Sequence, residues 1–412
     1  MILLDYYKSE LTDWVLSLGY PKFRANQLYD VLLSGKDANS KTNLPKEMLE
    51  HISSLSVMQP VKIEKLQESK KEHNVKFLYK LTDGHLIEGM LMQYKFGCTL
   101  CVSTQVGCKM NCAFCASGLN GWVRNLSAGE ILGQIVAVNT WLGGNATNRK
   151  ITNVVLMGMG EPLDNYDNVV KFLRQATKES FNFSCRNISL STCGIVPKIE
   201  KFADEGLPVT LCISLHAPND KIRTSIMPIA RSYNIHSILE AAQYYYTMTN
   251  RRIIIEYTVI DGVNDTFDNA KELSQLLGTL PCHVNVIRLN EVKERGLKAP
   301  TQNKCQEFVN TLNHFGISAT TRRTIGDDID GACGQLRNKV AVNVPQGKRL
   351  NQDDKPREVN KSKNARNSKR NDLDKSKRFV KNTKSNTIST RGSKIESKSN
   401  KNTKQKLHGN HR

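Results

Sequence analysis

Residues 108–115, CKMNCAFC, place Cys108, Cys112 and Cys115 at a C-x3-C-x2-C spacing. Structural metal sites usually take four protein ligands, so three closely spaced thiols leave one position open. Three thiolates can hold three irons of a 4Fe-4S cluster, whose fourth iron can then bind a small molecule through an amine and a carboxylate. The stretch therefore predicts such a cluster. A zinc site with its fourth ligand elsewhere in the chain is the alternative.

Short apolar runs alternate with helical stretches from about residue 94 onward. Near-continuous apolar strands between helices are typical of a parallel sheet covered by helices. Six such units, where a complete barrel has eight, predict an α/β fold with an incomplete (β/α)6 barrel over residues 94–345. Ligands of these folds bind at the carboxyl ends of the strands. The six runs are 100–106, 153–160, 187–192, 210–216, 252–260 and 283–290.

The residues before the barrel divide into two parts. Residues 1–58 contain three candidate helices, with Pro45 near the first turn of the last one. Residues 59–93 change to strand-like runs, with Asp83-Gly84 as a hairpin turn. The sequence therefore predicts an N-terminal helical accessory domain over 1–58 and a β-hairpin extension over 59–93.

The positive charge is concentrated at the end of the chain. Of a formal net charge of +20 over 412 residues, residues 346–412 contribute +15, because they hold 21 Lys and Arg against 6 Asp and Glu. This tail is rich in Lys, Asn and Ser and poor in apolar residues, so we expect a disordered basic tail. Two roles remain open, a solubilising tail and an electrostatic arm for a polyanion, RNA first among them.

The compartment follows from the cysteines. The chain has 11 of them, but its start, MILLDYYKSE, lacks the basic and apolar regions of a secretory signal. No apolar stretch is long enough to span a bilayer. We therefore expect a cytoplasmic protein without a membrane segment, in which cysteines bind metal or react more often than they form structural disulfides.

Phe114, directly before the last cysteine of the motif, makes the stretch resemble the radical S-adenosylmethionine superfamily. Further stretches narrow the resemblance to the adenine-C2 methyltransferases of ribosomal RNA, the RlmN family, from about residue 10 to residue 340. The C8-methylating sister family, which confers ribosomal antibiotic resistance, is the alternative. The stretches are HLIEG (85–89), LCVSTQVGCKMNCAFC (100–115), MGMGEP (157–162), SLSTCG (189–194), ISLHAPND (213–220) and GDDIDGACGQLR (326–337).

The resemblance implies a reaction that uses two molecules of S-adenosyl-L-methionine. The first methylates Cys333, and the second is cleaved to a radical that takes hydrogen from the new S-methyl group. The carbon radical then adds to the adenine and forms a covalent protein–RNA adduct. Cys101 attacks the Cys333 sulfur, forms a disulfide and frees the product, while Glu88 matches the proton acceptor of the family.

The resemblance also implies a cofactor-binding set and separates the remaining cysteines. Cys98 lies three residues before Cys101 and competes with it for the resolving role, and the spacing to the cluster favours Cys101. Glu291 stands where the family commonly has proline after the cofactor-contacting asparagine, which leaves the local loop geometry open. The cofactor-binding set is Gly160, Glu161, Ser191, Ser214, Leu215, His216 and Asn290; Cys185, Cys193, Cys212, Cys282 and Cys305 are interpreted as structural.

The partners implied are large-subunit ribosomal RNA, with transfer RNA as a second candidate, and a reduced flavodoxin- or ferredoxin-type electron donor. We expect a monomer whose residues 1–93 grip the folded RNA. Two rival classes remain. A radical activase that makes a glycyl radical would not need the Cys101/Cys333 pair, and an iron–sulfur RNA-binding protein would not need GMGEP.

Overall fold

The computed structural model describes residues 1–95, 97–322, 329 and 334–343. All of them belong to one compact unit, Met1–Gly347. The predicted basic tail, 346–412, lies outside the described residues, and so does Cys333. None of the helices that the structure describes is long and apolar enough to cross a membrane.

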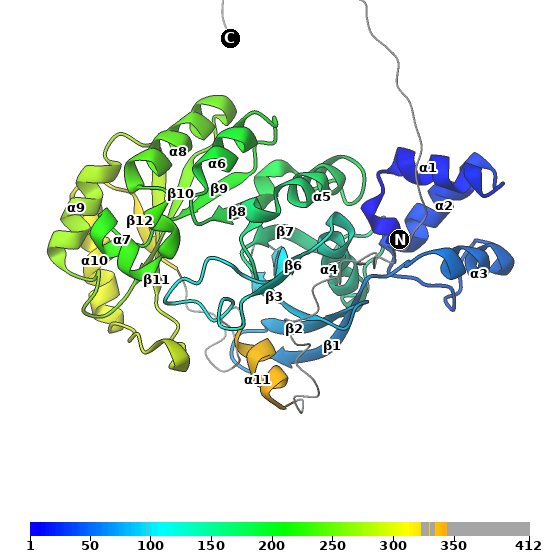
Figure 1. Ribbon diagram of the computed structural model, residues 1–412, viewed down its shortest axis with the longest axis horizontal. Helices are drawn as coiled ribbons and strands as arrows, with labels where there is room; N and C mark the ends of the chain where they lie inside the picture. Colours follow the sequence, from blue (N-terminus) through cyan, green and yellow to red (C-terminus); the bar gives the residue numbers. More distant parts are fainter. Residues whose placement is uncertain (96, 323–328, 330–333, 344–412) are drawn as a thin grey trace, which may run out of the picture. The chain divides into compact units, whose positions relative to one another are not determined.

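A mixed sheet of ten strands forms the centre of the described unit (Figure 1). Its order is β1-β2-β3-β4-β7-β8-β9-β10-β11-β12, and every pair from β4 to β12 is parallel. The strands are β1 Val61–Glu68, β2 Val75–Leu81, β3 Leu86–Tyr94, β4 Gly97–Cys101, β7 Ile151–Leu156, β8 Ile188–Thr192, β9 Thr210–Ser214, β10 Ile253–Val259, β11 Cys282–Arg288 and β12 Ala319–Thr321. A separate two-stranded sheet pairs β5 Gln105–Gly107 with β6 Trp122–Asn125.

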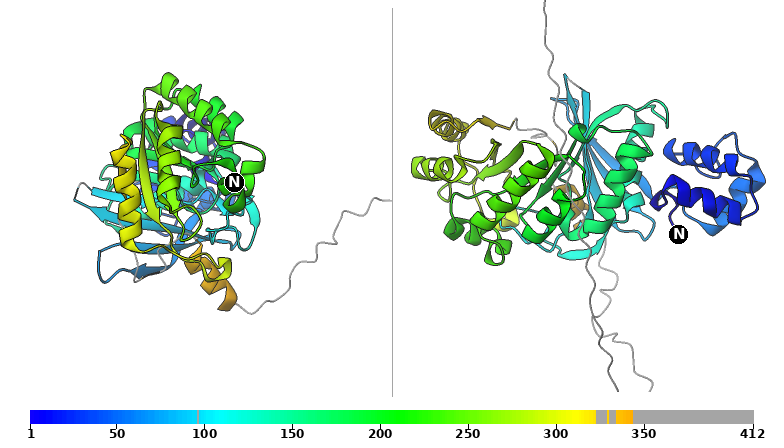
Figure 2. Two further views of the ribbon diagram at one scale, coloured as in Figure 1. Left: turned by 90° about the vertical axis from the view of Figure 1, so that its left-hand side faces the viewer. Right: turned by 90° about the horizontal axis from the view of Figure 1, so that it is seen from above.

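Helices follow the parallel strands and cover the outer face of the sheet (Figure 2). They are α4 Ala128–Trp141, α5 Tyr166–Lys178, α6 Val196–Ala203, α7 Asp220–Ile226, α8 Ile235–Thr249, α9 Phe267–Leu277 and α10 Gln302–His314. A capping box starts α4, where the Ser127 side chain accepts the Glu130 N–H and the Glu130 carboxylate accepts the Ser127 N–H. These six strand–helix units confirm the predicted incomplete α/β barrel.

The alternation of side chains in β10 shows how the core and the site separate. Ile253, Ile255 and Tyr257 are fully buried in the main hydrophobic core, and burial of each isoleucine contributes about 1.5–3 kcal/mol. Glu256 and Thr258 alternate with them and therefore point to the other face, the inside of the barrel. The outer face holds the fold together, and the inner face is available for chemistry.

Two details differ from the sequence prediction. The expected strand 100–106 is broken: residues 102–105 leave the sheet and pair with the loop after β7, since Gly158 N–H donates to Val102 O at 3.0 Å and Thr104 N–H to Met159 O at 2.9 Å. The parallel part also gains β12 after the sixth unit. Its three residues are too few to produce a recognisable apolar run.

The N-terminal segment is helical, as expected, with α1 Lys8–Ser17, α2 Lys22–Leu33 and α3 Lys46–Leu55. Leu3 and Leu4 are fully buried in the main core. The Gln175 amide of α5 donates to the carbonyls of Leu4 (3.0 Å) and Tyr6 (2.9 Å). Strands β1–β3 continue the main sheet through β4, so the contacts do not separate 1–58, 59–93 and 94–345. That division stays a prediction.

Candidate active site

The three-cysteine loop, residues 108–115, follows β5 at the carboxyl end of the barrel. Cys108 N–H donates to Gly121 O at 3.2 Å, and Ala113 N–H donates to Ile226 O, the last residue of α7, at 2.8 Å. Arg295 closes the loop from the other side, with its Nη2 at 2.7 Å from Asn111 Oδ1 and its Nε at 3.3 Å from Cys115 O. The loop is therefore fixed by backbone contacts that leave its thiols available.

Burial controls the protonation of these thiols. It raises the pKa of Cys108 to about 12, and burial together with the neighbouring Cys115 and Cys108 raises the pKa of Cys112 well above its usual range. Such thiols bind metal as thiolates only when a cationic centre takes the place of their protons. Their mutual proximity and their partial burial fit an iron–sulfur cluster.

The described residues give no support to a zinc site. No three His, Cys, Asp or Glu side chains among them converge as ligands of a single metal ion. A 4Fe-4S cluster does not require that arrangement, because each thiolate binds a different iron and the ligands stand farther apart. Cys108, Cys112 and Cys115 are thus the residues that would hold such a cluster.

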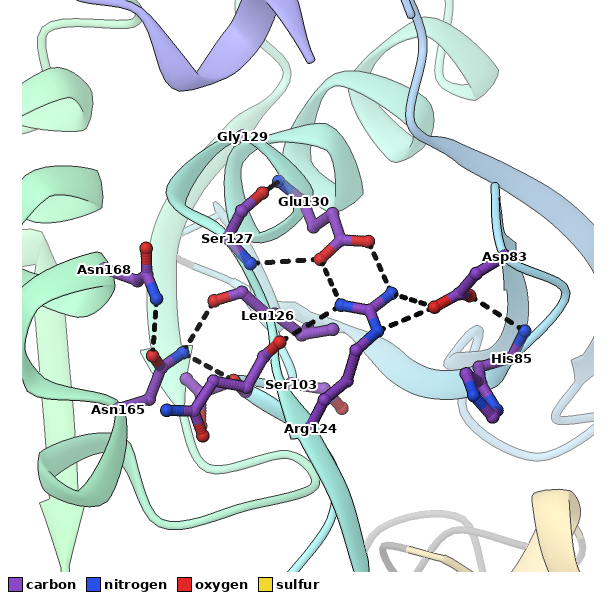
Figure 3. A network of polar contacts seen from close by, with 12 residues as sticks. Asp83, His85, Ser103, Arg124, Leu126, Ser127, Gly129, Glu130, Asn165 and Asn168 are labelled. Carbon is purple, nitrogen blue, oxygen red and sulfur yellow. Dashed lines mark hydrogen bonds and ion pairs between the residues drawn. The ribbon is translucent and has the colours of Figure 1, made fainter. Parts of the chain in front are cut away.

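A polar network supports the base of this loop (Figure 3). The Arg124 guanidinium on β6 binds both carboxylate oxygens of Glu130, at 2.7 and 2.8 Å, and an oxygen of Asp83 at 2.6 Å. These contacts raise the pKa of Arg124 above its usual range. On the same side of the barrel, the Asn165 amide donates to Leu126 O at 2.8 Å. The hairpin that flanks the three-cysteine loop is thereby tied to α4, to the β2–β3 turn and to the start of α5.

Ser103 connects three parts of the site. Its hydroxyl donates to Glu88 O at 2.6 Å and accepts the Met159 N–H at 2.9 Å. Its backbone N–H and carbonyl both bind the Gln134 side-chain amide of α4 at 2.9 Å. This fully buried serine therefore joins β3, the loop after β7 and α4.

The GMGEP loop contains two glycines that admit no side chain. A Cβ on Gly158 would lie 2.6 Å from Val102 O, and a Cβ on Gly160, which has φ +103°, would lie 2.6 Å from Gln105 Cβ. Glu161 follows, is buried, and accepts the N–H groups of Leu163 at 3.0 Å and Cys193 at 2.8 Å. Burial nevertheless raises the pKa of Glu161. This carboxylate therefore connects the segment after β7 with the end of β8.

Ser191 and Ser214 meet on the inner face of the barrel. Their hydroxyl oxygens lie 3.1 Å apart, and both bind Glu256 Oε2, at 2.7 and 3.3 Å. The other oxygen, Oε1, has no hydrogen-bond partner among the described residues and lies 3.8 Å from Arg322 Nη1. Sequence reasoning missed Glu256, although a carboxylate inside the apolar run IIIEYTV was a visible signal.

Leu215 and His216 contribute differently to the site. Leu215 is fully buried, its N–H donates to Glu256 O at 3.1 Å, and its carbonyl accepts Arg223 Nε at 3.2 Å. His216 accepts the Thr258 N–H on Nδ1 at 2.9 Å and packs edge-on against Phe114, with ring centroids 4.7 Å apart. Burial and the Arg223 charge lower the pKa of His216 to about 3, so the ring is neutral and carries its proton on Nε2.

A cavity with an empty volume of about 1180 Å³, open mouth included, lies beside these residues. Glu88, Cys101, Cys115 and Asn290 line it, together with Gly158. Cys101 faces the cavity among Met90 and Met92. Cys98 instead packs against the main core, on the opposite face of β4. The structure thus brings Cys101, and not Cys98, to the wall that holds Glu88.

Glu88 is the best-anchored carboxylate of the cavity. It is 1 % exposed and forms an ion pair of 2.7 Å with the buried Lys76 of β2. Its oxygens also accept the N–H groups of Gly334 at 2.8 Å and Arg337 at 2.5 Å, where α11 Gln335–Asn343 begins. Glu88 therefore holds the segment that directly follows Cys333. Lys76 was not predicted from the sequence, where its only distinguishing feature is a charged residue within the strand-like run VKFLYKL.

The comparisons with known proteins agree with this geometry. Residues 102–273 match the family model of the radical SAM superfamily, which covers the cysteine loop and most of the barrel. A crystal structure of a radical SAM methyltransferase from Sphaerobacter thermophilus is 39% identical, has a TM-score of 0.77, and covers 81% of this chain and 98% of that one. The fold and the site thus define a radical SAM enzyme.

The relatives define the family more closely. Dual-specificity RNA methyltransferases RlmN are 45% identical in Clostridium botulinum and in Clostridium tetani. The alignments cover 81% and 83% of this chain and 96% and 97% of those proteins. The chain belongs to the RlmN family, which confirms the resemblance and sets aside the rival classes of radical activase and of iron–sulfur RNA-binding protein.

Proposed function

We propose that this protein methylates C2 of an adenine in 23S ribosomal RNA, at the peptidyl-transferase centre, and of an adenine in transfer RNA. The observation that carries the proposal is the cavity: Glu88, Cys101 and the cluster-loop residue Cys115 line the same space in a member of the RlmN family. The electron-poor C2 carbon has no lone pair with which to attack a sulfonium methyl group. A cysteine that presents the methyl carbon to the ring solves this difficulty.

Cys108, Cys112 and Cys115 hold the 4Fe-4S cluster in this proposal. When bound, the cluster and S-adenosyl-L-methionine together supply the radical that activates the methyl group. The residues at the strand ends bind and orient the cofactor. Ser191 and Ser214 present hydroxyls that Glu256 already holds in place. Gly160 lets the cofactor approach the backbone closely, because it has no side chain. The neutral His216 keeps its Nε2–H as a hydrogen-bond donor. Glu161, Leu215 and Asn290 complete the predicted set.

Three residues carry out the transfer. Cys333, which lies outside the described residues, takes the methyl group and then joins its carbon to the adenine. Glu88 accepts the proton that leaves C2, and the one electron left on the ring after the radical has added is passed on to an electron carrier. The Cys101 thiolate attacks the Cys333 sulfur, so that an S–S bond forms, the S–CH2 bond breaks, and its electron pair passes to the product methyl carbon, which is protonated.

The test uses two cysteines of one strand. Cys101→Ala should accumulate a covalent protein–RNA species that survives denaturant and disappears on nuclease treatment, because the adduct has no exit. Cys98→Ala is the matched control and should behave as wild type, since its side chain packs into the core. The double variant Cys101→Ala/Cys333→Ala should show no shifted band. Trapping by Cys98→Ala alone would reassign the resolving thiol, and trapping by neither would contradict the covalent route.

A second measurement addresses the position of methylation. Mapping methyladenosine isomers in ribosomal and transfer RNA, from cells with and without the protein, should show 2-methyladenosine lost from both. Loss of 8-methyladenosine instead would assign the chain to the sister activity. We further propose that the protein acts as a cytoplasmic monomer supplied with electrons by a flavodoxin- or ferredoxin-type protein.

A further inference from the structure

Arg223 of α7 is a fully buried arginine whose hydrogen bonds all go to backbone carbonyls. Its Nη2 donates to Cys193 O at 2.6 Å and to Ser214 O at 3.5 Å, and its Nε donates to Leu215 O at 3.2 Å. Its Nη1 donates to Tyr233 O at 3.4 Å. The guanidinium thus reaches the ends of β8 and β9, and its Nε and both of its Nη atoms each have a carbonyl acceptor.

Its charge is not balanced in the same way. Among the residues that the structure describes, no carboxylate forms an ion pair with Arg223; the Asp220 carboxylate, which accepts the Ile235 N–H at 2.8 Å, acts on it only from a distance. Burial lowers the pKa of Arg223, which reports the cost of keeping this cation away from water. An isolated buried charge costs several kcal/mol unless an opposite charge lies nearby. Carbonyl dipoles alone do not supply that charge.

The three-cysteine loop lies next to this cation. Ile226, three residues after Arg223, accepts the Ala113 N–H at 2.8 Å. Cys112 packs in the same small apolar cluster as Cys193, Ile226 and Met227. Arg223 Nη2 donates to Cys193 O at 2.6 Å, so the guanidinium lies directly behind the residue on which Cys112 packs.

We propose that Arg223 is the fixed positive charge that balances the thiolates of the three-cysteine loop and favours the reduced state of the cluster they hold. The inference rests on the cluster of the proposed function. A 2+ core with three thiolates carries one net negative charge, and one electron from an external reductant makes it two, with no proton taken up at Arg223. A neighbouring cation stabilises the more negative state, so it raises the reduction potential.

The experiment compares cluster potentials in full-length, anaerobically reconstituted protein. Arg223→Gln removes the charge and keeps hydrogen-bonding capacity, and Arg223→Lys keeps a positive charge. Arg149→Gln is the matched control, because Arg149 also donates to a backbone carbonyl, Phe181 O at 2.8 Å, but does not contact the cluster loop. Potentials are read by electron paramagnetic resonance during a dithionite titration without S-adenosylmethionine or RNA, and iron content is measured in parallel.

We expect Arg223→Gln to shift the potential to a more negative value, Arg223→Lys to shift it less, and Arg149→Gln to leave it unchanged. A wild-type potential in an iron-replete Arg223→Gln protein would overturn the proposal. If Arg223→Gln fails to retain iron, retention by Arg223→Lys supports the charge role, and loss by both overturns it in favour of a purely structural one. Wild-type protein without a cluster would instead refute the proposed function.

Discussion

The parallel and antiparallel parts of the sheet each place a buried carboxylate at the cavity end of the barrel, in contrasting surroundings. Glu161, after the parallel strand β7, accepts the backbone N–H groups of Leu163 and Cys193, which lie near it in the fold. Glu88, on the antiparallel strand β3, pairs with a buried lysine and binds a segment 246 residues away in sequence. The parallel part thus ties neighbouring strand ends together, whereas the antiparallel part holds the segment that directly follows Cys333.

The largest expected effect falls on the three-cysteine loop, residues 108–115. Cys112→Ala should remove the brown chromophore and all methyl transfer, because two thiolates remain where three are needed. Iron content and visible absorption after anaerobic reconstitution provide the measurement. Cys185→Ala is the control, since Cys185 lies at the amino end of β8 and away from the loop. Full iron content in Cys112→Ala would contradict the cluster assignment.

The next effect falls on the antiparallel part. Lys76→Met should lower the free energy of unfolding by about 3–5 kcal/mol, because it leaves the Glu88 charge buried without its counter-ion. Denaturant unfolding measures the change. The double variant Lys76→Met/Glu88→Leu should recover much of the loss, since removing both charges also removes the desolvation cost.

A control for this experiment is the exposed ion pair Lys46–Glu50, 3.5 Å apart on α3. Lys46→Met should change stability little, because exposed pairs contribute little. If the double variant at positions 76 and 88 were as unstable as Lys76→Met, the buried pair would act through packing and not through charge.

A smaller effect concerns the pH dependence of stability and His216, which follows β9 in the parallel part of the sheet. The pKa of His216 is about 3 in the folded protein against 6.5 as its ordinary value, so below pH 6.5 the unfolded chain binds a proton that the native state does not. Stability from this residue is complete above 6.5 and falls with decreasing pH by up to about 1.4 kcal/mol per unit. His216→Asn should flatten the pH dependence of unfolding between about pH 6.5 and pH 5.

Asparagine is the chosen replacement because it tolerates the left-handed backbone of this position, where φ is +58°. The exposed His236 provides the comparison, and His236→Asn should leave the slope as in wild type. An unchanged slope in His216→Asn would mean that the native ring binds a proton as readily as the unfolded chain.

The smallest effect on the folded unit comes from the tail. Deleting residues 346–412 removes +15 of charge and should leave the unfolding free energy and the cluster unchanged. RNA affinity should fall, and its dependence on salt concentration should flatten, because fewer counterions are released on binding. An unchanged salt slope would favour the solubilising role.

Sequence reasoning predicted the parallel part well and the antiparallel part less well, for a physical reason. Residues at strand ends, such as Ser191 and Glu161, follow apolar runs that define where each strand stops. Glu88 and Lys76 lie within strands and pair across the sheet, and one sequence does not reveal which residues face each other in neighbouring strands. Glu88 was therefore found only through the family resemblance, and Lys76 and Arg223 were missed.

Ser103 has a consequence for how the molecule opens. One buried side chain and its backbone hold β3, the loop after β7 and α4 together, so none of the three can separate without breaking bonds that the other two share. Amide hydrogens of Ser103 and Met159 should therefore exchange with solvent in one cooperative event. The strand that carries Glu88 and the GMGEP loop therefore form a single mechanical unit.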